Sequence, residues 1–168
     1  MVTRRLKLKF EIMKHKTNVA VAIFLVVLMA GIMLISCDKD NDAPIQLGYT
    51  NIFIRPNSTE FIQLNTVGGW VYLTGGILSR GILVYRLSTD EFKAYERTPT
   101  YKPDSCCVYS PEEKCAKVIV EESGIIVKDT CSGSRYLILD GSIVEGPAKY
   151  SLLQYRTNYD GDILHIYN

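Results

Sequence analysis

The stretch that decides the fold runs from Asp129 to Ala148 and reads Asp-Thr-Cys-Ser-Gly-Ser-Arg-Tyr-Leu-Ile-Leu-Asp-Gly-Ser-Ile-Val-Glu-Gly-Pro-Ala. Within it, the short apolar runs Tyr136–Leu139 and Ser142–Val144 flank the dipeptide Asp140-Gly141. Asp-Gly between two apolar runs is a strong signal for a tight β-hairpin, because the two central residues of such a turn adopt positive φ. The stretch therefore predicts an antiparallel hairpin that follows a small polar loop.

The chain from residue 48 onward continues this pattern of short strands and turns. No stretch after residue 36 has the period of an amphipathic helix. The expected strands are Tyr49–Ile54, Phe61–Leu64, Trp70–Leu73, Gly81–Arg86, Phe92–Tyr95, Lys117–Glu121, Ile125–Val127, Tyr136–Leu139, Ser142–Val144, Leu152–Thr157 and Asp162–Tyr167. Gly81–Arg86 is mostly apolar, which is typical of a strand buried on both faces. Many short strands separated by Gly turns predict an all-β fold, an antiparallel sandwich or small barrel.

Residues 1–36 have the order of a secretory signal: a basic region, an uncharged apolar run over Val19–Ile35, and small residues before Cys37. The ending Leu34-Ile-Ser-Cys37 resembles a bacterial lipobox. That resemblance implies cleavage before Cys37 and lipidation of Cys37, including palmitate; the alternative is a transmembrane anchor. Translation starts at Met1 or at Met13, and the segment from Met13 makes the more compact signal.

Residues 37–47 form the expected tether between the lipid and the folded domain. Asp38–Pro44 is short, polar and charged, as a solvated linker is. An acidic stretch directly after the lipid-bearing Cys resembles the surface-export signal of Bacteroidetes lipoproteins. We therefore expect a lipid-anchored protein of the outer membrane, on its periplasmic or cell-surface side, with a folded domain over residues 48–168.

The charge balance disfavours nucleic acid as a partner. The whole chain has 19 Lys+Arg and 18 Asp+Glu, and the signal contains six of the former and Glu11 of the latter. The remaining chain has 13 basic and 17 acidic residues, a formal charge of −4. Nucleic-acid binding needs a basic face.

Four cysteines remain after Cys37, namely Cys106, Cys107, Cys115 and Cys131. An even number in an oxidising compartment predicts disulfides. A bond between the neighbours Cys106 and Cys107 would be strained, so we expect both to pair outward, to Cys115 and Cys131, in either combination. Three of these cysteines lie in a long irregular segment, Thr98–Lys117, which disulfides would hold.

The order of motifs in the last third of the chain resembles that of the Rieske iron–sulfur family. Gly133-Ser-Arg-Tyr136, Asp140-Gly141 and Gly146-Pro-Ala148 stand in register with the family's second cluster loop, and a Leu-x-x-Tyr strand, Leu152–Tyr155, follows. Upstream, Phe92-Lys-Ala94 precedes Thr98-Pro-Thr100 where the family has its first loop. The resemblance implies a Rieske-like β domain with a loop-rich subdomain over about residues 96–147.

The cluster ligands are the departure from the family. A Rieske [2Fe–2S] centre needs two Cys and two His. The matching positions are Thr98, Thr100, Asp129 and Ser132, and the chain's two His are His15, in the signal, and His165. We therefore expect no cluster and no cofactor.

The resemblance also bears on the disulfides. Some Rieske proteins join their two loops by a disulfide at the position where Cys131 stands. That implies Cys131 bonded to Cys106 or Cys107, and Cys115 bonded to the other.

Other chemistries are less well supported by the residues. The cysteines are not spaced as two Cys-x-x-Cys pairs for a metal, and a vicinal pair lacks the geometry of a redox Cys-x-x-Cys. A hydrolytic group of Asp129, Ser132 and Ser134 lacks a nearby His base. Asp129 and Arg135 are expected to form an ion pair, either an ordinary one of the loop or one inside the cluster pocket.

The sequence thus predicts a protein that is not an enzyme. We expect a binding or structural subunit of an envelope complex, with a membrane contact through its lipid and an envelope protein as partner. One alternative is electron transfer through a cluster with unusual ligands or through a reactive disulfide. Another is a small ligand bound between Thr98 and Ser132.

Overall fold

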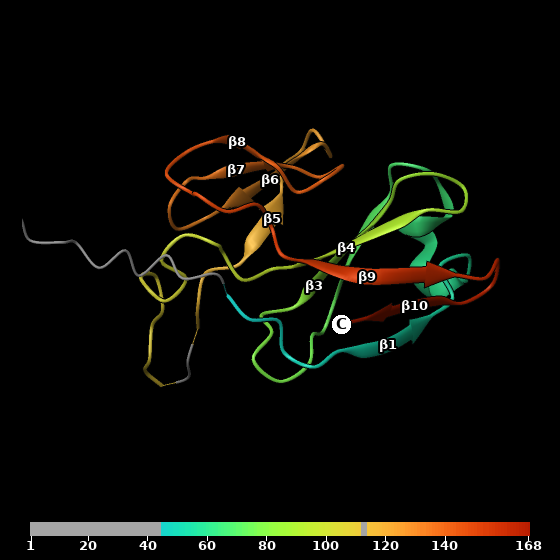
Figure 1. Ribbon diagram of the computed structural model, residues 1–168, viewed down its shortest axis with the longest axis horizontal. Helices are drawn as coiled ribbons and strands as arrows, with labels where there is room; N and C mark the ends of the chain where they lie inside the picture. Colours follow the sequence, from blue (N-terminus) through green and yellow to red (C-terminus); the bar gives the residue numbers. More distant parts are fainter. Residues whose placement is uncertain (1–44, 112–113) are drawn as a thin grey trace, which may run out of the picture. The chain divides into compact units, whose positions relative to one another are not determined.

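The computed structural model describes residues 45–111 and 114–168, so Cys37 and the predicted signal lie outside the described residues (Figure 1). The described chain is all-β, as predicted, with one short 3₁₀ helix. In order, the elements are β1 (Asn51–Ile54), η1 (Thr59–Asn65), β2 (Trp70–Leu73), β3 (Ile82–Arg86), β4 (Phe92–Glu96), β5 (Val118–Val120), β6 (Ile126–Asp129), β7 (Arg135–Leu137), β8 (Ile143–Glu145), β9 (Gln154–Tyr159) and β10 (Leu164–Tyr167).

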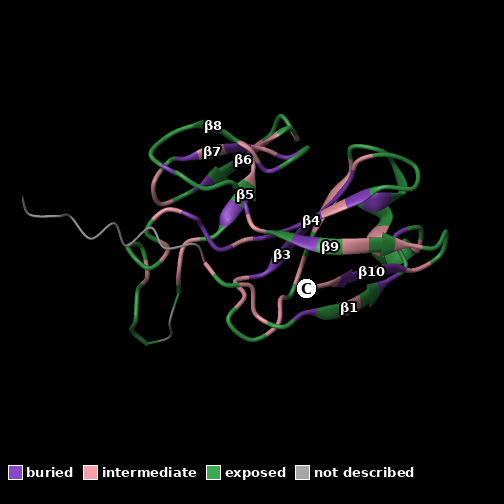
Figure 2. Cartoon of the chain, in the orientation of Figure 1, coloured by how far each residue is buried: buried purple, intermediate pink, exposed green. Residues whose placement is uncertain are grey.

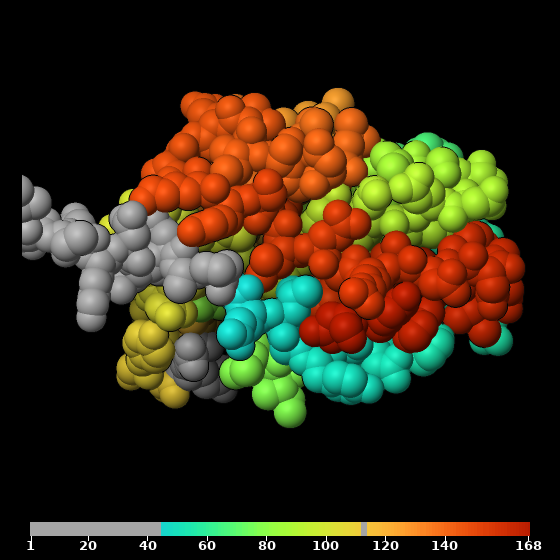
Figure 3. Space-filling view, in the orientation of Figure 1, coloured from blue at the N-terminus to red at the C-terminus, as the bar shows by residue number. Residues whose placement is uncertain are grey.

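The strands form two antiparallel sheets. The larger has six strands in the order β1-β10-β9-β4-β3-β2 and is curled like half a barrel. The smaller has four strands in simple sequence order, β5-β6-β7-β8. In the larger sheet the first described strand pairs with the last, with Asn51 opposite Tyr167. In Figure 3 the cyan segment at the start of the described chain lies against the red C-terminal strands.

The strand β3 is buried on both faces, which confirms the prediction from its apolar sequence. Ile82 and Val84 belong to the first apolar cluster, which packs on one face of the six-stranded sheet. Leu83 and Tyr85 point the other way, into a second cluster that includes residues of the smaller sheet. All five residues of β3 are buried (Figure 2). This strand and its neighbour β4 therefore separate two cores.

The prediction of a strand over Phe61–Leu64 is wrong, because this segment lies in the 3₁₀ helix η1. Leu64 is buried and Phe61 half-buried against the first cluster. The backbone is kinked at Phe61, whose φ of −116° and ψ of 43° are not helical. A run of only four residues, Phe-Ile-Gln-Leu, is too short for its periodicity to separate a strand from a helical turn. The Gly68-Gly69 turn after the helix then leads directly into β2.

An antiparallel hairpin forms around Asp140-Gly141, as predicted, but its loop is longer than a two-residue turn. Ile138 and Leu139, which were expected in the strand, lie in the turn, because β7 ends at Leu137 and β8 begins at Ile143. β7 and β8 pair antiparallel around it, with Tyr136 opposite Ile143. Gly141 has φ of +75°, and the Asp140 carboxylate accepts a 2.9 Å hydrogen bond from the Ser142 amide. The turn thus uses the positive φ of Gly141 and the side-chain acceptor of Asp140, whereas Asp140 itself does not have the positive φ of a two-residue Asp-Gly turn.

Arg97 and Tyr72 join the two sheets. The Arg97 guanidinium lies 3.6 Å from the centroid of the Tyr72 ring, and its Nε donates to the Val118 carbonyl at 3.1 Å. The Tyr72 hydroxyl accepts a 2.8 Å hydrogen bond from the Val120 amide. The outer edge of β5 is therefore bonded to residues at the edge of the larger sheet.

Candidate functional site

The candidate site consists of two loops beside the smaller sheet, one between β4 and β5 and the other between β6 and β7. The positions that match the Rieske ligands lie at the start of the first loop and around the second. Thr98, Thr100 and Asp129 are buried, and Ser132 is half-buried. Each of these four side chains has hydrogen-bond partners within the protein.

In the first loop, the two threonines bond to different parts of the fold. Thr98 donates from both its amide and its hydroxyl to the Glu96 carboxylate, at 2.9 and 2.7 Å. The Thr100 hydroxyl donates to the Tyr150 carbonyl at 2.7 Å and lies 2.9 Å from the Tyr136 hydroxyl. The hydroxyls of both threonines are thus engaged in local hydrogen bonds.

The second loop is a tight turn organised by Asp129. Its carboxylate accepts from the amides of Cys131 and Ser132, at 2.8 and 3.2 Å, and from the Ser132 hydroxyl. The Ser132 hydroxyl lies 2.8 Å from that of Ser134, which accepts from the Ala148 amide at 3.1 Å. This is the common behaviour of Asp in a turn, where the side chain takes up backbone amides.

Tyr136 connects the two loops through its hydroxyl. It is fully buried and hydrogen-bonded to Thr100 of the first loop. Burial raises the pKa of the Tyr136 phenol, a hydrogen bond with Thr100 opposes that rise, and the nearby Asp129 charge reinforces it. The structure therefore brings Thr100 and Asp129 near the same phenol, whereas Thr98 turns away to Glu96.

Two disulfides hold the loops, as predicted. Cys106 is bonded to Cys131, which joins the first loop to the second. Cys107 is bonded to Cys115, which closes a short hairpin within the first loop. This is one of the two combinations that the sequence left open. The Ser105 hydroxyl lies 3.2 Å from the Cys131 sulfur.

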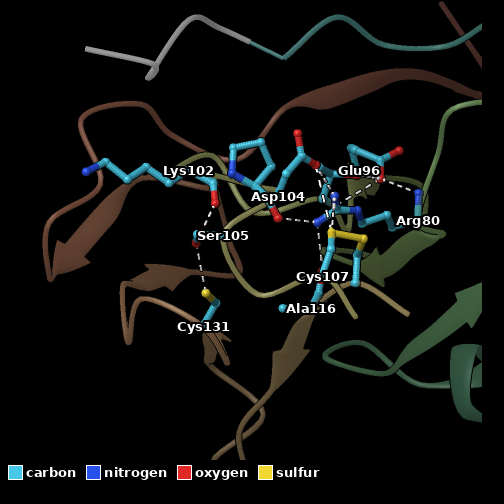
Figure 4. A network of polar contacts seen from close by, with 11 residues as sticks. Arg80, Glu96, Lys102, Asp104, Ser105, Cys107, Ala116 and Cys131 are labelled. Atoms are coloured by element: carbon cyan, nitrogen blue, oxygen red, sulfur yellow. Dashed lines mark hydrogen bonds and ion pairs between the residues drawn. A yellow bond between two sulfur atoms is a disulfide. The ribbon is translucent and has the colours of Figure 1, made fainter. Parts of the chain in front are cut away.

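A polar network that sequence reasoning missed anchors the first loop (Figure 4). The Arg80 guanidinium donates to the carbonyls of Pro103 and Ala116, at 2.6 and 3.1 Å, and pairs with Asp104 at 2.7 Å. It also lies 3.5 Å from the Cys107 sulfur. A single side chain thereby fixes both ends of the disulfide-bonded loop.

Glu96 is the second member of this network. Its carboxylate is buried and accepts five hydrogen bonds, from the Ser79 hydroxyl, the Arg80 amide, both donors of Thr98 and the Tyr155 hydroxyl. A buried carboxylate needs such partners, because its charge is costly to remove from water. The sequence signal that could have indicated Glu96 is an acidic residue at the end of an otherwise half-apolar strand, Phe92–Glu96.

The donor set does not fit a [2Fe–2S] cluster. Such clusters take thiolate and imidazole ligands, whereas Thr98, Thr100, Asp129 and Ser132 offer oxygen atoms that are already hydrogen-bonded. The nearby sulfur atom, that of Cys131, is in a disulfide. Among the described residues, no group of three or more His, Cys, Asp or Glu side chains is arranged to hold a metal ion.

The expected ion pair between Asp129 and Arg135 is wrong. Arg135 pairs instead with Glu121 at 2.7 Å and with Glu145 at 3.1 Å. The register places Arg135 opposite Lys128 in β6, and neighbouring residues of a strand point to opposite faces. Asp129 therefore points to the buried face, whereas Arg135 lies on the outer one.

His165 contacts residues outside the two loops. It lies on β10, stacked between Phe53 and Tyr167, with ring centroids 4.2 and 4.5 Å away. Its Nε2 lies 2.7 Å from the Asn51 side-chain oxygen. The hydrogen-bonded group of Asp129, Ser132 and Ser134 thus supplies a carboxylate and two hydroxyls. The His that a hydrolytic triad would need, His165, contacts other residues.

Two open clefts lie beside η1. One, of about 600 Å³, runs along β2, and a smaller one, of about 330 Å³, lies at the end of β1. Both share Glu60 and Phe61 as lining residues.

Comparison with protein families and with curated proteins finds no family model that matches the chain and no curated relative. Within the residues that the structure describes, no helix is long and apolar enough to cross a membrane.

Proposed function

We propose that the chain is an outer-membrane lipoprotein with a cluster-free Rieske-like domain, and that it acts as a binding or structural subunit of an envelope complex. The observation that carries the proposal is the state of the two loops. The positions that match cluster ligands are occupied by hydrogen-bonded oxygen side chains, and a disulfide joins the loops. These loops are a rigid, non-catalytic scaffold.

The Rieske part of the proposal is supported by the agreement between the motif order and the strand order. The stretch that resembles the second loop spans β7, the Asp-Gly turn and β8, and the Leu-x-x-Tyr segment leads into β9. The cross-loop disulfide uses Cys131, the position that the resemblance implies. Fold alone carries no activity, so the role is inferred from the loops themselves.

The test is purification of the tagged full chain from its own membranes in a gentle detergent, followed by identification and quantification of co-purifying proteins. We expect one envelope protein in near-stoichiometric amount. A matched Cys37→Ser variant removes the lipid attachment site, so mass spectrometry should find acyl groups on Cys37 of the wild-type chain and none on the variant, which keeps residues 1–36. A chain that is isolated alone from wild-type membranes contradicts the subunit role, and an unmodified Cys37 in the wild-type chain contradicts the lipid anchor.

A second candidate, thiol–disulfide exchange at Cys107–Cys115, is favoured by the Arg80 contact. A guanidinium 3.5 Å from the Cys107 sulfur would stabilise the thiolate that leaves when an external dithiol attacks Cys115. The second thiol of the reductant then releases Cys115 as a thiol, so two electrons pass from the dithiol to the disulfide. The Asp104 carboxylate, 3.9 Å from the same sulfur, opposes this effect. Mass spectrometry after mild dithiol treatment decides: two free thiols at Cys107 and Cys115 support exchange, and an unchanged mass rules it out.

A further inference from the structure

The strand β2 forms one of the two free edges of the larger sheet. It is last in the strand order, and among the described strands it pairs with β3 alone. Edge strands present unpaired backbone N–H and C=O groups that can pair with another strand. The sequence Trp-Val-Tyr-Leu has no charge and no proline, the features by which proteins commonly block such pairing.

The register shows which backbone groups of β2 are free. The Arg86 amide donates to the Gly69 carbonyl at 2.9 Å, and hydrogen-bonded positions alternate along an antiparallel pair. Val71 and Leu73, opposite Val84 and Ile82, therefore turn their backbone groups toward β3. The amides and carbonyls of Trp70 and Tyr72 point to the open side.

A groove follows this edge. The cleft of about 600 Å³ is bounded by η1 on one side and by Gly68–Tyr72 on the other. Its volume is in the range of clefts that bind ligands. The backbone of η1 abuts the start of the strand, since a Cβ on Gly69 would overlap the Gln63 carbonyl. The cleft at the opposite edge of the sheet is smaller and touches only Phe53 and Ile54 of β1.

The chemistry of the groove indicates the occupant. Apolar Phe61 and Val71 line it together with the acidic Glu60. Among the ion pairs formed by the described residues, none uses Glu60. An extended peptide would satisfy the outward groups of Trp70 and Tyr72, and a Lys or Arg on it would pair with Glu60.

We infer that the groove beside β2 binds an extended, basic peptide segment of a partner protein, which adds to the larger sheet as a seventh strand. This mode of recognition takes affinity from backbone hydrogen bonds and specificity from alternate side chains. The inference rests on the proposed binding role and names the kind of segment that the partner supplies.

The test uses the purified full chain in detergent and a displayed library of linear peptides as the probe. Selected peptides are synthesised and added while amide hydrogen exchange is followed residue by residue. We expect peptides with a Lys or Arg, and roughly tenfold or greater slowing of exchange at the Trp70 and Tyr72 amides. Glu60→Lys should weaken binding by about tenfold, and the matched charge reversal Glu122→Lys, on the exposed β5–β6 turn, should not.

Three results overturn the inference. One is a selection in which no peptide is enriched more strongly on this protein than on an unrelated lipoprotein. Another is enrichment of peptides that protect amides elsewhere, such as those of β1. The third is protection of Trp70 and Tyr72 that grows with protein concentration in the absence of peptide, which would identify a second copy of the chain as the occupant. Because the library contains no native partner, the result of the peptide test does not depend on whether an envelope protein co-purifies with the chain.

Discussion

The two sheets of this protein are held together in different ways. The six-stranded sheet surrounds an apolar cluster, and its strand β3, next to the edge strand β2, is buried at every residue. In the four-stranded sheet the last strand, β8, is exposed at every residue, and the adjoining loops depend on two disulfides and on the Arg80 network. The comparison teaches that apolar burial dominates the first region, whereas the region that resembles a cluster site adds covalent and polar links to the apolar cluster that it shares with β3.

The largest expected effect comes from Glu96, where the two regions meet. Glu96→Ala leaves donors on Ser79, Thr98 and Tyr155 without their acceptor. Buried donors that lose a charged partner are costly, so we expect a loss of roughly 3–5 kcal/mol in the free energy of unfolding. Chemical denaturation measures this loss. The control is Glu91→Ala, an exposed acid paired with Lys93, which should cost less than about 1 kcal/mol. Equal losses for both variants would contradict the central role of Glu96.

Removal of the disulfides should loosen the loops and the smaller sheet and leave the larger sheet protected. Cys106 and Cys131 are 25 residues apart and Cys107 and Cys115 are 8 apart, so loop-closure entropy gives about 3.5 and about 2.5 kcal/mol for the two bonds. We expect paired Ser substitutions to follow this order in denaturation. Hydrogen exchange should rise in the loops and in β5–β8, while β3 and β4 stay protected. Faster exchange in β3 from either variant would show that the regions are not independent.

Alkaline pH should weaken both cores through buried phenols. Burial, followed by the hydrogen bond to Glu96, raises the pKa of Tyr155 from 10.0 to about 12. The unfolded phenol loses its proton first, so this stabilisation is complete below pH 10 and is lost as the pH rises toward 12, at about 1.4 kcal/mol per pH unit. Burial also raises the pKa of Tyr95 and Tyr136, which should add to the slope.

Unfolding free energies measured at several alkaline pH values test this expectation. Tyr155→Phe removes one phenol and should flatten the slope relative to wild type. An identical slope in the variant would mean that Tyr155 does not titrate with folding.

The smallest effect is expected on the surface of the larger sheet. Arg55 and Asp162 form a 3.2 Å pair in which both side chains are largely exposed. Such pairs contribute little, so Arg55→Ala should change the unfolding free energy by less than about 1 kcal/mol. Thermal unfolding at low and high salt checks this, and a large salt-dependent loss would show that the exposed ion pair contributes more than its geometry suggests.

The sequence predicted features that depend on neighbouring residues. β2 has the predicted bounds, Trp70–Leu73, and the Asp140-Gly141 turn forms the expected hairpin, because strand alternation and turn chemistry are local. The helix η1 was missed because the run Phe61–Leu64 is too short for its periodicity to separate a strand from a helical turn.

Sequence reasoning could not find contacts that join distant segments. Glu96 receives hydrogen bonds from Arg80 and from Tyr155, which are 16 and 59 residues away. No local pattern indicates such partners. For the same reason the spacing of the cysteines left two disulfide combinations open. The predicted partner of Arg135 was Asp129, whereas the sheet register brings Arg135 to Glu121 and Glu145.

The most direct test of the central claim is an iron assay and a visible absorption spectrum of the protein isolated from its native cells, together with mass spectrometry of its cysteines. If hydrogen-bonded side chains and a disulfide occupy the cluster positions, the protein is colourless, contains far less than one iron per chain, and retains the Cys106–Cys131 bond. Two irons per chain with the visible absorption of a [2Fe–2S] centre would contradict the claim.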